Sequence, residues 1–189
     1  MSSIYDKQRS NLIRKYEGFE PEAYRLHGEN FNTIGYGSTS YEDGSAVGNQ
    51  DKISKKQAQE LLDFHIERTR EPVSTLVGYK KLPPGAQVAV DSFAYNTGPN
   101  FIYDDEGFGT INRAIRAGDA KAVADALPLY DNGGLAGLVR RRAEEASAHR
   151  GRQGCAGRHH PGRCGRGRRR QRWRRRWQQC RRRIATTRR

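Results

Sequence analysis

The chain has 189 residues and a formal net charge of +14, but that charge is divided unevenly along the sequence. Residues 147–189 hold 17 Arg and no Lys, Asp or Glu, so the other 18 basic and 21 acidic residues leave 1–146 at −3. A basic nucleic-acid-binding fold is therefore not indicated for 1–146, and no specific nucleic-acid partner is expected.

All three Cys and both Trp also lie in 147–189, so 1–146 cannot depend on a disulfide and must be held by packing. The first residues lack the apolar stretch of a signal peptide, and nowhere do about 18 apolar residues run together. These features predict one folded domain, 1–146, made as a soluble cytosolic protein and followed by a separate basic segment.

The first predicted element is a helix that begins at Ser2 or Ser3 and ends at Gly18, with apolar residues from Ile4 to Tyr16 on one face. Residues 24–37 then mix aromatic and β-branched residues with glycines. That mixture predicts a short hairpin or small sheet with tight turns, which 41–51 should continue as loop or strand.

Helical spacing resumes at Ser54, where Ser54 and Gln57 have the spacing of a capping box. Further helices are predicted over 85–97, 109–117, 120–127 and 135–145, with glycine or proline near their ends. The expected fold class is therefore α+β, with a small sheet lobe near the N-terminus and a larger helical lobe after it.

The densest chemical pattern is Tyr16-Glu17-Gly18-Phe19, followed by Ala23-Tyr24 and then by Asn32-Thr33-Ile34-Gly35-Tyr36-Gly37. This pattern places a carboxylic acid at the end of a helix, next to glycine-rich backbone that a sugar chain can approach closely. Glycoside hydrolysis needs such an acid, partly buried so that it keeps a proton near neutral pH. A solvated helix-end glutamate followed by a plain hairpin has the same spacing, so spacing alone leaves the function open.

The combination E-G-x4-A-Y followed by T-I-G-Y-G resembles the phage-type lysozymes, a family with a lysozyme-like fold. Two later segments, Asp91 to Gly98 and Gly137 to Glu144, resemble that family's S-F-x-[FY]-N-x-G and G-L-x-x-R-R helices. The three motifs occur in the family's order and cover roughly residues 4–146. The resemblance implies a glycosidase that cuts bacterial peptidoglycan, works as a monomer and needs no cofactor or metal.

The resemblance also implies roles for single residues. Glu17 would protonate the glycosidic oxygen between N-acetylmuramic acid and N-acetylglucosamine, and Thr33 would help to hold the attacking water. The expected substrate-binding residues are Tyr24, Gly35, Tyr36, Gly37 and Asn96.

Two of the matched segments leave alternatives open. Asn96 would brace the sheet lobe against the helical lobe, or simply be a polar residue at a helix end. Arg140 to Arg142 would either contact the Glu17 region by charge or form a solvated basic helix face.

One departure concerns the second catalytic group. Many members of the family have an Asp two residues after the Tyr of A-Y, but Leu26 occupies that position here, and the loop before Thr33 is one residue longer. His27 or Glu29 could replace the Asp after a loop shift. His27 is the catalytic candidate because imidazole titrates near neutral pH, although a turn histidine is often just exposed. Glu29 is expected at the surface.

Residues 147–189 do not resemble the family and are expected to be disordered, because they combine few apolar residues with dense like charge. Three interpretations compete: a segment read out of frame, a cationic binder of lipopolysaccharide or anionic lipid that uses Trp173 and Trp177, and a non-specific nucleic-acid binder. The His and Cys between Cys155 and Cys164 have a spacing unlike that of known zinc sites.

The leading functional hypothesis is an endolysin that is made in the host cytoplasm and reaches the cell wall in the periplasm after another agent releases it. One alternative is a catalytically weakened lysozyme fold that binds glycan without cleaving it. The other is a protein that binds nucleic acid or lipopolysaccharide through residues 147–189.

Overall fold

The computed structural model describes residues 3–25 and 27–148. Of the basic segment 147–189, only residues 147 and 148 are described. The expectations for that segment, namely disorder, lipid or nucleic-acid binding and an unusual His and Cys spacing, therefore lie outside the described residues. Leu26 lies outside them as well.

The N-terminal helix α1 (Ile4–Glu17) begins and ends where its sequence predicts. Ser3 and Asp6 form a capping box, in which the Asp6 N–H donates to Ser3 Oγ and the Ser3 N–H donates to Asp6 Oδ2. Gly18 ends the helix with a φ of 70°. The chain therefore leaves the helix directly after Glu17, whose side chain belongs to the last turn.

A two-stranded antiparallel sheet follows, made of β1 (Glu20–Tyr24) and β2 (Thr33–Gly35). Tyr24 lies opposite Thr33, and Glu20 lies opposite Gly35. Isolated bridges between Glu22 and Lys52 and between Ser40 and Ala46 continue the small lobe as far as Lys52. The predicted hairpin is confirmed.

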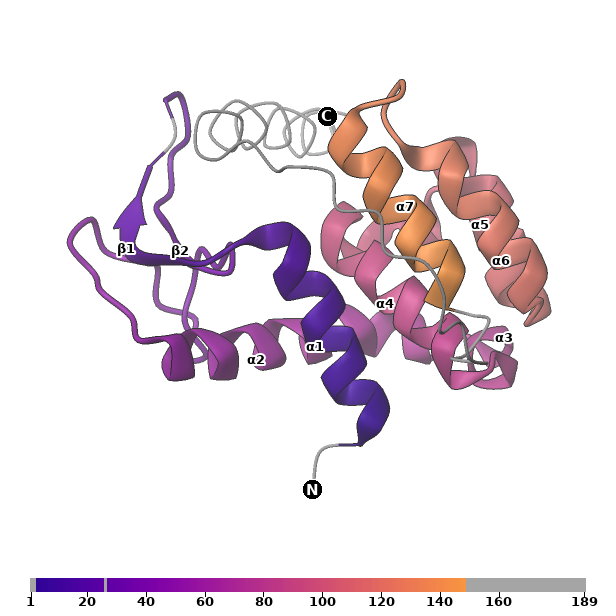
Figure 1. Ribbon diagram of the computed structural model, residues 1–189, viewed down its shortest axis with the longest axis horizontal. Coiled ribbons are helices and arrows are strands. Elements are labelled where there is room, and N and C mark those ends of the chain that lie inside the picture. Colours follow the sequence, from indigo (N-terminus) through magenta and orange to yellow (C-terminus); the bar gives the residue numbers. More distant parts are fainter. Residues whose placement is uncertain (1–2, 26, 149–189) are drawn as a thin grey trace, which may run out of the picture. The chain divides into compact units, whose positions relative to one another are not determined.

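Helix α2 (Lys55–Ser74) joins the two parts of the molecule, as Figure 1 shows. It begins at the predicted capping box of Ser54 and Gln57. Residues in its N-terminal half, from Ala58 to Ile66, pack in one core with Ile34 and Tyr36 of the hairpin. Val73, near its C-terminal end, belongs to a second core among the later helices.

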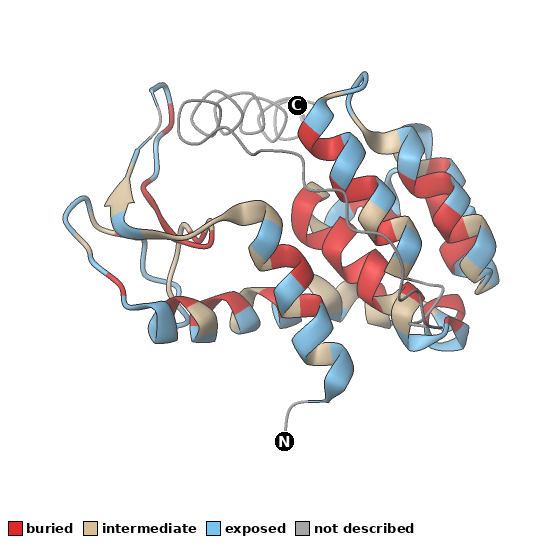
Figure 2. Ribbon diagram, in the orientation of Figure 1, coloured by how far each residue is buried: buried red, intermediate tan, exposed pale blue. Residues whose placement is uncertain are grey.

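The second core is built by the remaining elements: α3 (Val77–Lys81), α4 (Pro84–Thr97), the 3-10 helix η1 (Pro99–Tyr103), α5 (Asp105–Ala117), α6 (Ala120–Ala126), the 3-10 helix η2 (Leu127–Tyr130) and α7 (Ala136–Ala148). Helix α4 contacts α1, α2 and α7, and ten consecutive or near-consecutive residues of it are buried (Figure 2). A helix that is apolar on most sides is expected to lie at the centre of its fold.

The sequence did not predict α3 or η1, which are both short. Helix α3 packs very closely on α5. A Cβ atom at Gly78 would stand 2.0 Å from the Ile115 carbonyl oxygen, so only glycine allows this approach.

The α+β fold class is confirmed, with a small two-stranded sheet near the N-terminus and a mostly helical remainder. Helix α7 continues to Ala148, three residues beyond its predicted end. Within residues 3–148, no helix is long and apolar enough to cross a membrane.

Candidate active site

The side chain of Glu17 is almost completely buried at the end of α1. It is 6% exposed, and its Oε1 accepts a hydrogen bond of 2.8 Å from Nη1 of Arg141, which comes from α7. The sequence offered two interpretations of Arg140 to Arg142. The contact with the Glu17 region is confirmed for Arg141, whereas Arg140 is exposed.

Arg141 is itself held on every side. Its Nε donates to Glu145 at 3.0 Å, its Nη2 donates to the Ser92 carbonyl oxygen at 3.1 Å, and its guanidinium lies 5.6 Å from the Tyr16 ring centre. Burial alone would lower the pKa of Arg141, but the charges of Glu17 and Glu145 raise it above its usual value. Arg141 is therefore a fixed cation that orients the Glu17 carboxyl.

Tyr16 supports the same arrangement from the outer side. Its hydroxyl donates to Glu144 at 2.6 Å, and burial together with this bond raises the pKa of Tyr16. The hydroxyl thus keeps its proton across the physiological range and remains a donor. Lys15 also pairs with Glu144 at 2.6 Å, so the last turn of α1 is tied to α7 at several points.

The second Glu17 oxygen, Oε2, faces the turn after β2. Gly37 has a φ of +98°, and a Cβ atom built there would stand 3.7 Å from Glu17 Oε2. Glycine is favoured in this backbone region and leaves the space in front of the carboxyl without a side chain. The turn and the acid are therefore neighbours, as the sequence pattern predicted.

Thr33 is 3% exposed, and its hydroxyl oxygen has no hydrogen-bond partner among the described residues. Most buried polar atoms in proteins are bonded to protein or to ordered water, so the Thr33 hydroxyl has a hydrogen-bonding capacity that no described residue uses. Its cross-strand neighbour is Tyr24, which is partly exposed.

Gly35 and Tyr36, predicted to bind the substrate, both make packing contacts around the hairpin. A Cβ at Gly35 would lie 3.2 Å from the Ala58 Cβ, so Gly35 packs on α2. The Tyr36 ring lies 5.5 Å from the Phe19 ring, and the Tyr36 carbonyl accepts a bond of 3.4 Å from the Tyr95 hydroxyl.

Asn96 does not make the predicted brace between the two lobes. It is buried in α4, where its Oδ1 accepts a hydrogen bond from Nη2 of Arg142 in α7, so it links two helices of the same core. It is not the helix C-cap either, because Gly98 has that place. Its neighbour Tyr95 does reach the hairpin, where its hydroxyl donates to the Tyr36 carbonyl.

The two candidates for the second catalytic group differ in burial. His27 is exposed in the turn between the strands, whereas Glu29 is only 8% exposed. The expectation that Glu29 lies at the surface is therefore wrong. Hydrophobic spacing does not reveal this burial, because Glu29 is a polar residue in a Gly-Glu-Asn segment. Within the described ranges, no group of three or more His, Cys, Asp or Glu is arranged to hold a metal ion.

Residues 14–145 match the family model of phage lysozyme. The chain belongs to the phage lysozyme family. As a member of this family it is a lysozyme-type glycosidase that hydrolyses peptidoglycan.

Solved structures support the same assignment. A mutant of the P22 lysozyme has a TM-score of 0.61 and 26% identity, and the match covers 75% of this chain and 94% of the P22 chain. The muramidase domain of SpmX from Asticaccaulis excentricus has a TM-score of 0.61 and 28% identity, and the match covers 76% of this chain and 95% of that domain. No curated protein matches the chain.

Proposed function

We propose that this lysozyme hydrolyses the β-1,4 bond between N-acetylmuramic acid and N-acetylglucosamine, with Glu17 as the general acid. The observation that carries the proposal is the placement of the Glu17 carboxyl. One oxygen is held by the buried Arg141, and the other faces Gly37, which has no side chain. A carboxyl fixed in this way can meet a glycosidic oxygen without first reorganising.

In the proposed reaction, Glu17 donates its proton to the glycosidic oxygen while the bond between that oxygen and C1 of N-acetylmuramic acid breaks. A water molecule attacks C1 from the opposite face of the sugar, and the proton that it loses passes to a base. The products are a reducing N-acetylmuramic acid end and a free hydroxyl on N-acetylglucosamine.

Thr33 is proposed to hold this water, because its buried hydroxyl has a hydrogen-bonding capacity that no described residue uses. Tyr24 and the turn from Gly35 to Gly37 are proposed to contact the glycan, mainly through the backbone and through Tyr24. Asn96, enclosed between α4 and α7, is better explained as a structural residue.

The base is proposed to be Glu29 or His27, and burial favours Glu29. Replacing the base should lower kcat by about 10²–10⁴-fold and remove the acidic limb of the pH–rate profile. We expect this result for Glu29→Gln, with His27→Gln as the matched variant in the same loop. If His27→Gln loses activity and Glu29→Gln keeps it, the base is His27. A thermal melt of each variant separates loss of the base from loss of the fold.

The biological role is proposed to be lysis of the host bacterium. The protein would be made in the host cytoplasm and would act on the wall in the periplasm after another agent opens the inner membrane. A second candidate is a lysozyme fold that grips glycan without cutting it, because Leu26 stands where many family members have an Asp.

Mass spectrometry of the fragments released from purified peptidoglycan tests these proposals together. Reducing N-acetylmuramic acid ends are the expected product. Anhydro ends would indicate intramolecular cyclisation instead of hydrolysis, and reducing N-acetylglucosamine ends would indicate a different bond. Retention of the protein on the wall with no released fragment would support the glycan-gripping alternative.

A further inference from the structure

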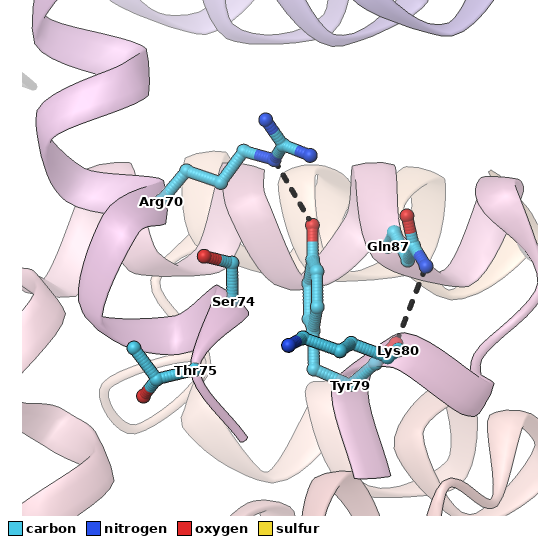
Figure 3. A pocket seen from close by; sticks show the side chains of 6 residues that line it. All are labelled: Arg70, Ser74, Thr75, Tyr79, Lys80 and Gln87. Atoms are coloured by element: carbon cyan, nitrogen blue, oxygen red, sulfur yellow. Dashed lines mark hydrogen bonds between the residues drawn. The ribbon is translucent and has the colours of Figure 1, made fainter. Parts of the chain in front are cut away.

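A polar cavity of about 520 Å³ lies at the C-terminal end of α2, away from the hairpin. Figure 3 shows the six residues that line it, which come from the end of α2, from α3 and from α4: Arg70, Ser74, Thr75, Tyr79, Lys80 and Gln87. None of them takes part in the proposed hydrolysis. Ala58, which packs under the hairpin, is 16 residues before Ser74 in the same helix, or about 24 Å along its axis.

Arg70 is a positioned cation at one side of this cavity. Its Nε donates to the Tyr79 hydroxyl at 3.3 Å, and that hydroxyl donates to Asp91 at 2.9 Å. Tyr79 is 2% exposed, so Arg70 is held from the protein interior. Its Nη1 pairs at 2.9 Å with Glu67, whose side chain is 60% exposed, on the solvent side. The guanidinium therefore has a fixed direction.

Lys80 supplies a second cation, and it makes no ion pair or hydrogen bond with any residue in the described part of the chain. Its side chain extends beside the Tyr79 ring, with the ammonium group directed toward Ser74 and Thr75 (Figure 3). Arg70 also lies 3.8 Å from Asp91 Oδ2, so Glu67 and Asp91 largely offset its charge. Lys80 is therefore the cation that is left to attract an anion such as a carboxylate.

The other polar groups offer oxygen acceptors. The Ser74 hydroxyl donates to the Glu71 carbonyl and the Thr75 hydroxyl donates to the Pro72 carbonyl. The Gln87 amide nitrogen donates to the carbonyls of Tyr79 and Leu82, at 3.3 and 3.1 Å. With these hydrogens used, the two hydroxyls and the Gln87 Oε1 can only accept. A complementary ligand therefore carries an anion close to N–H or O–H donors.

We propose that this cavity is a second cell-wall site, which binds the free C-terminal carboxylate of a peptide side chain of peptidoglycan. The carboxylate pairs with Lys80, on the side of the cavity that holds Ser74 and Thr75, and the peptide N–H groups donate to these hydroxyls or to Gln87. This inference rests on the proposed function, because it requires the wall as the substrate. A second contact some 24 Å along α2 from the hairpin raises the effective concentration of glycan at Glu17.

Binding can be measured with the full-length protein by following backbone and Gln87 side-chain amide signals by NMR. The probe is N-acetyl-D-alanyl-D-alanine, with its C-terminal amide as the uncharged control. The matched variants are Lys80→Glu, in the cavity, and Lys81→Glu, which makes the same charge change on the same helix but does not line the cavity.

We expect the dipeptide to shift the signals of Tyr79 and Gln87, the amide control to bind more weakly, and Lys80→Glu to weaken binding by roughly three- to tenfold relative to Lys81→Glu. Equal binding by the two variants would overturn the proposal. Binding of glycerol 3-phosphate at these residues without binding of the dipeptide would overturn the assignment to a peptide carboxylate.

Kinetics separates this proposal from the function on which it rests. On intact peptidoglycan, the KM of Lys80→Glu should exceed that of Lys81→Glu by a similar factor, with equal kcat. On glycan strands stripped of peptide, the two variants should not differ. If the wild type cuts neither substrate, the proposed function fails, whereas the NMR titration still decides the binding site. If the variants differ equally on both substrates, the peptide site is wrong.

Discussion

The Glu17 carboxyl is held within a set of buried charges. Arg141 bonds both Glu17 and Glu145, and Arg142 pairs with Glu145 as well. Buried ion pairs contribute little net stability, because removing both charges from water offsets their attraction. These pairs instead fix the geometry, because Arg141 cannot turn away from Glu17 without also breaking its bonds to Glu145 and to the Ser92 carbonyl.

Replacement of Glu17 by Gln should abolish most lytic activity while the fold is retained. The amide keeps the shape of the side chain but cannot serve as a general acid, so turnover should fall by about 10²–10⁴-fold. Release of reducing ends from purified peptidoglycan measures this loss. Glu22→Gln is the control, because Glu22 lies on β1 with its side chain 67% exposed and pairs only with Lys52 among the described residues. A Glu17→Gln variant with more than half of the wild-type activity would exclude Glu17 as the acid.

Replacement of Gly37 by Ala should damage activity more than stability. A positive φ in a non-glycine residue costs about 1–3 kcal/mol, and the new methyl group would stand 3.7 Å from Glu17 Oε2, where the substrate must approach. Misplacing the substrate by an ångström can cost about a hundredfold in rate. Gly44→Ala is the matched control, since Gly44 has a φ of +86° and nothing within 4 Å of its added Cβ.

The two substitutions should therefore destabilise the protein similarly in thermal melts, while only Gly37→Ala should lose activity. Equal activity in the two variants would show that the turn at Gly37 does not border the substrate.

Prediction from sequence succeeds for residues within one short segment and fails where distant segments meet. Glu17 and Gly37 lie within 21 residues of each other, and a hairpin brings them together. The partner of Glu17 is 124 residues away, so the sequence could only leave two alternatives for Arg141. Asn96 and Tyr95 are adjacent in α4 but bond to different partners, Arg142 and Tyr36. Predicting these partners would require knowing how α4 is rotated in the core.

At the scale of elements, the helix ends were predictable because their signals are local. Both capping boxes, at Ser3 and at Ser54, depend on residues three apart, and Gly18 and Gly98 end helices as expected. Helix α3 has only five residues and no side-chain cap, too few for a helical period to be recognised. It exists because the second core and α5 hold it in place.

The contact between α3 and α5 makes Gly78→Ala a test of this dependence. The added Cβ would stand 2.0 Å from the Ile115 carbonyl oxygen and 2.3 Å from that of Arg116, which are backbone atoms that cannot rotate away. We expect a loss of about 3 kcal/mol or more in the free energy of unfolding, measured by chemical denaturation. Gly109→Ala in α5 is the control, since its new Cβ would meet only the flexible end of Arg113, at 3.3 Å. If both variants unfold like the wild type, α3 does not pack on α5 as described.

At the scale of the whole molecule, the basic charge lies outside the part of the chain that the structure describes. Within that part, residues 3–148 build two hydrophobic cores and the buried ion pair of Glu17 and Arg141. All 17 arginines that make the chain basic come after residue 149. The division also explains why the overall charge of +14 is a poor guide to a protein whose residues 1–148 carry −3.

Removal of residues 149–189 should consequently leave a folded and active lysozyme. The truncation keeps α7 whole and removes 17 positive charges, so affinity for anionic lipid vesicles, lipopolysaccharide or DNA should fall steeply and lose its dependence on salt. Hydrolysis of purified peptidoglycan should persist, because Glu17, Arg141, Thr33 and Gly37 all remain.

The measurements are a thermal melt, a vesicle and DNA binding assay across salt concentrations, and the release of reducing ends. Loss of both the cooperative transition and the activity would mean that residues such as Trp173 and Trp177 pack on the lysozyme fold, and that the basic segment is part of the folded protein.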